Sequence, residues 1–330
     1  MKKVAFFTES NFSGKISINH PNLRTDLAWM VLLDAEHHPI PNFYQPSSKG
    51  KYDIGIIIIP KNNPQRVWEG LEFINWYCTD IFLMQEGPNW HWQDWNLSDQ
   101  IEYINLLSSD LITGLLCHNR SDLNYYRGLS NKPVFVLPTA MVPTSLGSHS
   151  RDLEVERRSN TMIGGNMVSW YGGMDSLLVA NVFEQPVFVP AMGRMKDEDL
   201  QFEAINVLPY TDWVGWMEHL ADFKYAVHLM RTHAAGTFAL NCAYYGIPCI
   251  GYRGLDTQEM CHPNLSVDLG DLRYAKYLAN LLRDDDQFYA HQSAVARKNY
   301  DDHFSPQIFL DSEFVQTFVK VKSENTSVHS

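Results

Sequence analysis

The sequence predicts an α/β protein made of two doubly wound parallel sheets in tandem. Two observations lead to this fold class. Short apolar runs with the character of buried strands alternate with longer helix-like segments, and the alternation stops at a charged stretch over residues 151–160 and then resumes. Strands that alternate with helices pair in parallel and are covered on both faces. The length of 330 residues also fits two domains.

The first 150 residues contain five runs rich in Ile, Val, Leu and Phe, which are typical of buried strands. These runs are Val4–Thr8, Tyr52–Pro60, Ile81–Gln85, Leu111–Cys117 and Val134–Pro138. Four segments between them carry apolar residues at helical spacing, and two of these begin at a serine suited to capping a helix. The four are Arg24–Ala35, Pro64–Tyr77, Ser98–Leu107 and Ser121–Leu129. Residues 1–150 are therefore expected to form one Rossmann-like domain.

The same alternation continues after the linker expected at 151–160. The expected strands are Thr161–Ile163, Val187–Pro190, Ala226–Met230 and Pro248–Tyr252. The expected helices are Asp175–Phe183, Trp213–Ala221, Phe238–Tyr245, Leu272–Arg283 and Asp286–Tyr300. This gives a second Rossmann-like domain over 161–304, a helix over 305–322 returning toward the first domain, and a polar tail over 323–330. Open α/β sheets bind ligands at the carboxyl ends of their strands, so we expect the functional site in the cleft between the domains.

Composition excludes several classes of protein. The chain has 26 Lys and Arg against 38 Asp and Glu, a formal net charge of −12, which argues against a broad basic surface for nucleic acid but leaves a local basic cleft open. No apolar run approaches the roughly 20 residues of a membrane span, and the start lacks a signal-peptide pattern. The five cysteines have no CxxC spacing, which indicates buried thiols in a reducing compartment. We therefore expect a cytoplasmic protein with neither a disulfide framework nor a zinc site.

The segment His233–Ile250 carries the clearest chemical motif. Gly236 at a strand-to-helix turn lets a diphosphate approach the backbone N–H groups of a helix N-terminus. A residue further along that helix can reach a ribose, and Gly246-x-Pro248 turns the chain into the next strand. This segment resembles the donor-site signature of GT-B glycosyltransferases, and Ile163-Gly164-Gly165 and Gly173–Ala180 resemble the strand end and helix that the family places before it.

The resemblance implies the GT-B fold over the whole chain and a nucleotide sugar, expected to be UDP-linked, as co-substrate rather than a cofactor. The chain departs from the family pattern at three positions: His233 and Asn241 replace the two acids of the motif, and Gly172 replaces a lysine. Asn241 retains hydrogen-bonding capacity for a ribose, whereas His233 either contacts the sugar or a phosphate or caps the turn. Cations for the diphosphate are then expected from elsewhere in the domain. The expected donor-binding residues are Gly164, Gly165, Arg194, Lys196, Arg231, His233, Gly236, Thr237 and Asn241, with Arg231 the first choice of cation.

In the first half, a strand ends at Glu86, and Gly87-Pro88 and a polar loop with three tryptophans follow. A carboxylate at a strand end that faces the cleft is placed to act as a general base toward an acceptor hydroxyl, and indole rings stack on sugars and bases. The alternative for the loop is that two of its tryptophans pack against the helix that follows. Glu86 is the first candidate base, with Asp94, His118 and Glu9 as alternatives. The expected acceptor-binding residues are Ser13, Gly14, Trp90, His91, Trp92 and Trp95, whereas His37-His38 is expected in an exposed loop.

The sequence therefore predicts a metal-independent glycosyltransferase acting on a glycan or other soluble hydroxyl compound. The named alternative is a phage-type DNA glycosyltransferase that modifies a hydroxymethylated base. Residues 67–119 contain no Lys or Arg, which argues against DNA, whereas Lys and Arg in the first 66 residues could gather on one rim and favour it. A non-catalytic sugar-binding protein and a nucleotide-sugar epimerase of the same fold are further alternatives.

Overall fold

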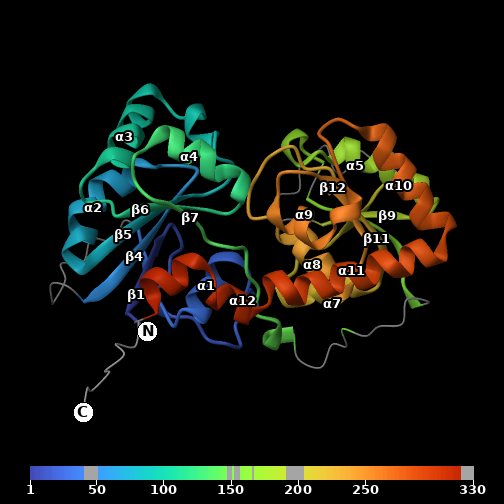
Figure 1. Ribbon diagram of the computed structural model, residues 1–330, viewed down its shortest axis with the longest axis horizontal. Helices are drawn as coiled ribbons and strands as arrows, with labels where there is room; N and C mark the ends of the chain where they lie inside the picture. The colour runs from blue at the N-terminus through green and yellow to red at the C-terminus, as the bar shows by residue number, and fades with distance from the viewer. Residues whose placement is uncertain (41–50, 147–150, 152–156, 166, 191–203, 321–330) are drawn as a thin grey trace, which may run out of the picture.

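The computed structural model shows two α/β domains side by side (Figure 1). It describes residues 1–330 except 41–50, 147–150, 152–156, 166, 191–203 and 321–330. Among the helices of these described residues, none has the length and apolar character needed to cross a membrane.

The first sheet has the strand order β2-β3-β1-β4-β5-β6-β7, with every neighbouring pair parallel except β2 with β3. The order reverses between β1 and β4, so the carboxyl ends of these strands form the switch point of this sheet. Its strands are β1 (Val4–Thr8), β2 (Gly14–Lys15), β3 (Glu36–Pro39), β4 (Tyr52–Ile59), β5 (Cys78–Gln85), β6 (Gly114–Cys117) and β7 (Val134–Val136). Its helices are α1 (Thr25–Leu32), α2 (Gln65–Tyr77), α3 (Leu97–Ser108) and α4 (Leu123–Leu129).

The five strands expected in this domain are confirmed, and β2 and β3 are additions. The expectation of an exposed His37-His38 loop is wrong: both residues lie in β3, and the His37 side chain is fully buried. Its Nε2 lies 2.9 Å from the hydroxyl of Thr8, and its Nδ1 lies 2.7 Å from the carbonyl oxygen of Phe12. Two adjacent histidines interrupt the apolar pattern that marks a buried strand in the sequence. Strand β3 is therefore revealed only by its pairing with β1.

The expected helix caps also differ from those observed. Helix α3 is capped by Asn96, whose side-chain oxygen accepts a hydrogen bond from the Asp99 backbone N–H at 3.0 Å, rather than by Ser98. Ser121 precedes α4, but its hydroxyl donates to the carbonyl oxygen of Gly254 in the second domain at 2.8 Å. A side chain expected to stabilise a local turn thus forms a contact between domains.

The second sheet is entirely parallel, with the order β10-β9-β8-β11-β12-β13 and its switch point between β8 and β11. Its strands are β8 (Ser159–Ile163), β9 (Val187–Pro190), β10 (Asn206–Leu208), β11 (Phe223–His228), β12 (Cys249–Tyr252) and β13 (Ser266–Val267). Its helices are α5 (Gly173–Ala180), α7 (Trp213–Ala221), α8 (Thr237–Tyr245), α9 (Asp256–Cys261), α10 (Leu272–Asp284) and α11 (Asp286–Phe304). The short elements β10, α9 and β13 were not expected, and β11 begins and ends earlier than expected.

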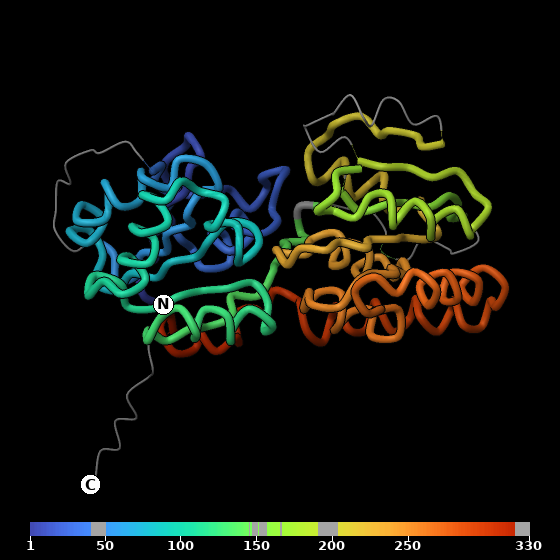
Figure 2. Tube along the Cα trace, turned by 90° about the horizontal axis from the view of Figure 1, so that it is seen from above, coloured from blue at the N-terminus to red at the C-terminus, as the bar shows by residue number. Residues whose placement is uncertain are grey.

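The C-terminal segment crosses from the second domain back to the first (Figures 1 and 2). The single helix expected after Ser305 is instead two pieces, α12 (Pro306–Leu310) and a π-helical turn, η8 (Val315–Val319). Phe314 lies between these two pieces. The centre of its ring is 4.9 Å from the ring centre of Phe82 on β5 and 6.2 Å from that of Phe135 on β7. The Lys2 backbone N–H donates to the carbonyl oxygen of Val319 at 2.8 Å. The last described segment is therefore part of the first domain's packing.

Candidate active site

A cavity of about 330 Å³ lies at the carboxyl end of the second sheet, beside the β8 and β11 switch point. Open α/β sheets bind ligands at this position. The ends of β8, β9, β10 and β11, the helices α7 and α8, and one first-domain side chain line the cavity. The lining includes Arg24, Gly165, Pro190, Leu208, Tyr210, Trp216, His228, Gly236, Thr237 and Asn241.

The N-terminus of α8 forms one wall of the cavity, as its glycine motif predicts. Gly236 precedes the helix with φ +67°, a left-handed conformation that glycine adopts without steric cost. A Cβ at Gly236 would lie 2.2 Å from the Thr257 hydroxyl oxygen, which donates to the Gly236 carbonyl oxygen at 2.8 Å. Both backbone conformation and packing therefore require glycine here. The first turn of α8 lies at the cavity, and the N–H groups of a first helical turn have no partner within their own helix.

Two glycines at the end of β8 allow close packing on the opposite side. A Cβ at Gly164 would lie 2.5 Å from the His228 ring and 2.7 Å from the Phe238 ring. Gly165, with φ +74°, lines the cavity beneath Tyr171. Gly165 thus contributes to the cavity wall, whereas Gly164 makes room for the His228 ring.

Asn241 lines the cavity and is only 2% exposed. In either amide orientation, its side-chain oxygen accepts a hydrogen bond from an indole N–H of α7. The donor is Trp213 at 3.4 Å in one orientation and Trp216 at 3.1 Å in the other. In the second orientation its nitrogen also donates to the Thr237 carbonyl oxygen at 3.3 Å. These contacts fix the amide between α7 and α8, so the replacement of an acid by asparagine suits a neutral, indole-lined wall.

Arg24 supplies the cationic group that lines the cavity from the first domain. The loop that carries it docks on the start of α7, where the Asn22 side-chain oxygen accepts from the Trp213 N–H at 2.8 Å and the Pro21 carbonyl oxygen accepts from the Val214 N–H at 3.1 Å. Sequence reasoning placed Arg24 only among the rim cations of the DNA alternative. Its position just before the first helix of a Rossmann-like domain was the available signal, because such positions face the cleft.

Arg231 and His233, two expected donor-binding residues, lie elsewhere in the described structure. The Arg231 guanidinium forms an ion pair with Asp175 of α5, with an Nη2 to Oδ2 distance of 2.7 Å, and the described cavity lining does not include it. His233 lies at the domain interface, with its ring packed on Gly254: a Cβ there would come within 2.0 Å of Nε2. Arg194 and Lys196 fall outside the described residues.

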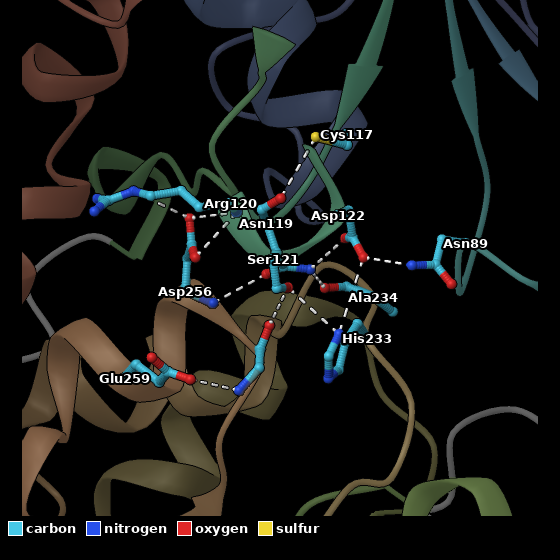
Figure 3. Close-up of polar contacts among 11 residues, drawn as sticks. Asn89, Cys117, Asn119, Arg120, Ser121, Asp122, His233, Ala234, Asp256 and Glu259 are labelled. Atoms are coloured by element: carbon cyan, nitrogen blue, oxygen red, sulfur yellow. Dashed lines mark hydrogen bonds and ion pairs between the residues drawn. The ribbon is translucent and has the colours of Figure 1, made fainter. Parts of the chain in front are cut away.

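A polar network joins the two domains beside the cavity (Figure 3). The side chain of Asn119, only 1% exposed, donates to the Ala234 carbonyl oxygen and accepts from the Asp256 N–H, each at 3.0 Å. The buried carboxylate of Asp122 accepts from Asn119 at 3.2 Å and lies 3.9 Å from Nδ1 of His233. Burial raises the pKa of Asp122 above its usual range. The network joins the loop before α8 to the first domain, and His233 lies within it.

In the first domain, charged groups lie together at the carboxyl ends of β4 and β5. Glu86 forms an ion pair with Lys61, with an Oε1 to Nζ distance of 3.2 Å, and both side chains are partly exposed. Glu86 interacts electrostatically with Asp26 in the first turn of α1, and burial raises the pKa of Asp26. Sequence reasoning missed Asp26, because nothing in the chain's pattern shows that the start of α1 approaches the end of β5.

The remaining candidate bases occupy less suitable places. His118 follows β6, stacks on Trp29 with ring centres 5.4 Å apart, and has its pKa lowered to about 4 by burial. Asp94 is exposed and lies 3.7 Å from His91. Glu9 is an exposed residue after β1. The exposed Ser13 precedes Gly14, which lies in the edge strand β2.

The tryptophan loop packs largely against the first domain's own core. The Trp92 N–H donates to the Tyr125 hydroxyl at 2.8 Å, and the Trp95 N–H donates to the Lys61 carbonyl oxygen at 2.8 Å. Both indoles also contact Tyr103 of α3, as the packing alternative expected. Trp90 is 38% exposed, so its ring face is the most available for a ligand.

Among the described residues, no cluster of three or more His, Cys, Asp or Glu side chains is arranged to hold a metal ion. No family model and no curated protein matches the chain. Solved structures do match. Sucrose-phosphate synthase from Thermosynechococcus elongatus has a TM-score of 0.65 at 10% identity and covers 94% of this chain and 97% of its own.

Two further structures extend the comparison. An alpha-glucosyltransferase solved with UDP and a 13-mer DNA containing an HMU base has a TM-score of 0.60 at 10% identity, covering 94% of this chain and 97% of its own. A TarM variant from S. aureus solved with UDP has a TM-score of 0.56 at 12% identity and covers 78% of this chain. The match covers 54% of TarM, so this chain spans about half of that length. All three are GT-B glycosyltransferases, and this chain has the GT-B fold that the resemblance of its glycine motif implies.

Proposed function

We propose that the chain is a glycosyltransferase that binds a nucleotide sugar in the second-domain cavity and transfers the sugar to an acceptor hydroxyl. One observation carries the proposal: the cavity combines a sheet switch point, the glycine-preceded N-terminus of α8 and the cationic side chain of Arg24. The helix N-terminus and the guanidinium of Arg24 each favour binding of a diphosphate. The TarM and alpha-glucosyltransferase structures contain UDP, which supports UDP-sugar as the donor.

In the proposed reaction, the acceptor oxygen forms a bond to the anomeric carbon as the bond to the diphosphate breaks. The leaving nucleoside diphosphate gains negative charge, which the N–H groups of α8 and the guanidinium of Arg24 stabilise. Arg24 reaches the cavity only because its loop docks on α7, so domain contact completes the donor site. A cationic side chain and a helix terminus together can take the place of a divalent metal ion.

The proton of the acceptor hydroxyl goes to a carboxylate of the first domain. Glu86 is the proposed base, because it directly follows β5, the strand next to the switch-point strand β4, and its partly exposed carboxylate is accessible to an acceptor. Asp26 is the alternative base, since it lies within electrostatic reach of Glu86 and two residues from Arg24. Burial raises the pKa of Asp26, so its carboxylate is more basic than that of an ordinary aspartate, which suits proton acceptance.

The proposed acceptor is a glycan or another soluble hydroxyl compound. Lys2, Lys3, Lys15 and Lys51 do gather, but around a second cavity at the amino end of β1, which is opposite to the cleft side of the sheet. Those cations are therefore not placed to hold DNA across the donor site. DNA stays the second candidate, because the alpha-glucosyltransferase solved with DNA matches nearly the whole chain. The five cysteines are free and buried, which supports a cytoplasmic location.

A panel of nucleotide sugars, with nucleoside diphosphate release followed in the presence of mixed soluble acceptors, tests the proposal. Release with one donor, together with mass-spectrometric transfer to an acceptor, is the expected result. Hydroxymethylated DNA in a parallel arm separates the two acceptor classes. Binding without release or transfer would favour a sugar-binding protein, and isomerised sugar still attached to the nucleotide would favour an epimerase. No binding of any donor would refute the proposed function.

A further inference from the structure

His228, the last residue of β11, stands out in the donor cavity. This residue is only 5% exposed, and it lines the cavity at the switch point. Neither ring nitrogen has a hydrogen-bond partner among the residues that the structure describes. The ring packs between Gly164 and Phe238, with 5.2 Å between the His228 and Phe238 ring centres. A buried polar group without a partner is destabilising, so this residue calls for an explanation.

Two other buried histidines among the described residues, His37 and His262, each have at least one hydrogen-bond partner in the protein. His37 contacts the Thr8 hydroxyl and the Phe12 carbonyl oxygen, and His262 contacts the Ala239 carbonyl oxygen through Nε2 at 3.0 Å. His228 differs from both because neither of its ring nitrogens has a hydrogen-bond partner among the described residues. Its strand neighbour Val227 is a fully buried apolar residue. Packing alone would be satisfied by an aliphatic side chain at this position.

We infer that His228 is a ligand-binding residue that donates a hydrogen bond to the diphosphate of the bound nucleotide sugar. This inference rests on the proposed function. The imidazole lies where the ends of β8 and β11 meet the first turn of α8, beside the backbone N–H groups assigned to the diphosphate. Phosphate oxygens accept hydrogen bonds, and a neutral imidazole always carries one N–H donor. Burial lowers the pKa of His228 to about 4, so the ring enters the cavity neutral at pH 7 and donates through one nitrogen.

The test compares His228→Leu with wild-type protein, using UDP and uridine as probes in calorimetry and competition binding. Leucine fills similar space and lacks hydrogen-bonding groups. We expect about 10- to 100-fold weaker UDP binding, the range for a lost hydrogen bond to a charged group, with uridine binding unchanged. His228→Gln keeps a donor and is expected to recover most of the UDP affinity.

Thermal unfolding distinguishes loss of a ligand contact from damage to the fold. His228→Leu is expected to unfold at the wild-type temperature or above it, because the substitution removes an unpaired buried polar group. Unchanged UDP affinity in His228→Leu would overturn the inference, and so would an equal loss for UDP and uridine. If wild-type protein binds neither UDP nor any other nucleotide of the donor panel, the proposed function fails instead.

Discussion

Replacing Glu86 with glutamine tests the assignment of the general base, because the amide keeps the size of the side chain and removes its proton affinity. The structural cost is small. Glu86 and Lys61 are 40% and 37% exposed at their side chains, and an ion pair this accessible contributes about 0–1 kcal/mol. We therefore expect the free energy of unfolding to fall by less than about 1 kcal/mol. Loss of a general base slows turnover about 10²- to 10⁴-fold, so the two effects differ clearly in size.

The assay is the initial rate of nucleoside diphosphate release at saturating donor and acceptor, with donor affinity measured separately. Glu86→Gln is expected to bind donor as tightly as wild-type protein and to lose kcat. Glu72→Gln, an exposed position on α2, is the matched control and is expected to retain the wild-type rate. A Glu86→Gln rate within about threefold of wild type would refute the role of this carboxylate, since a general base accelerates the reaction by at least about 10²-fold.

Three other substitutions give separate expectations. Asp26→Asn should raise the free energy of unfolding at pH 7 in urea titrations, because burial raises the pKa of this carboxyl and so disfavours the charged form in the folded state; equal or lower stability would contradict this. Asn119→Ala should lower the free energy of unfolding by about 2–3 kcal/mol, since the buried amide bonds to Ala234 and Asp256 across the domains, and an unchanged Tm would argue against it. His228 has a folded pKa of about 4, below its unfolded value, so wild-type stability should fall relative to His228→Leu as pH drops from about 6.5 toward 4; parallel stability curves would count against the buried, neutral ring.

Much of the fold follows from sequence pattern alone. Helix α7 and strands β1 and β9 lie at their expected bounds, because each is a strongly patterned segment, and polar residues flank α7 and β1 on both sides. Strands β10 and β13 have three and two residues, too few to show a period, and they form because neighbouring strands supply partners. Tertiary pairing thus decides the elements that carry no local signal.

The candidate site divides in the same way. The glycine motif located the α8 wall of the cavity, since a left-handed turn before a helix leaves a local trace in the sequence. The sequence did not show which cation lines the cavity. Arg231 forms an ion pair with Asp175, whereas Arg24 reaches the cavity from the other domain. The tryptophan loop appeared polar along the chain, yet Trp92 and Trp95 bury their rings against Tyr103.

By itself, the sequence determined two α/β domains with largely parallel sheets and a helix N-terminus preceded by glycine. These features depend on residues close together in the chain, where periodicity and glycine conformation act directly. Only the tertiary structure decided that Asp26 approaches Glu86, that Asn119 bonds to the loop before α8, and that His228 is buried without a described partner in the second-domain cavity. The physical reason is that hydrogen bonds, ion pairs and desolvation depend on distance in space, and folding brings together side chains that are many residues apart.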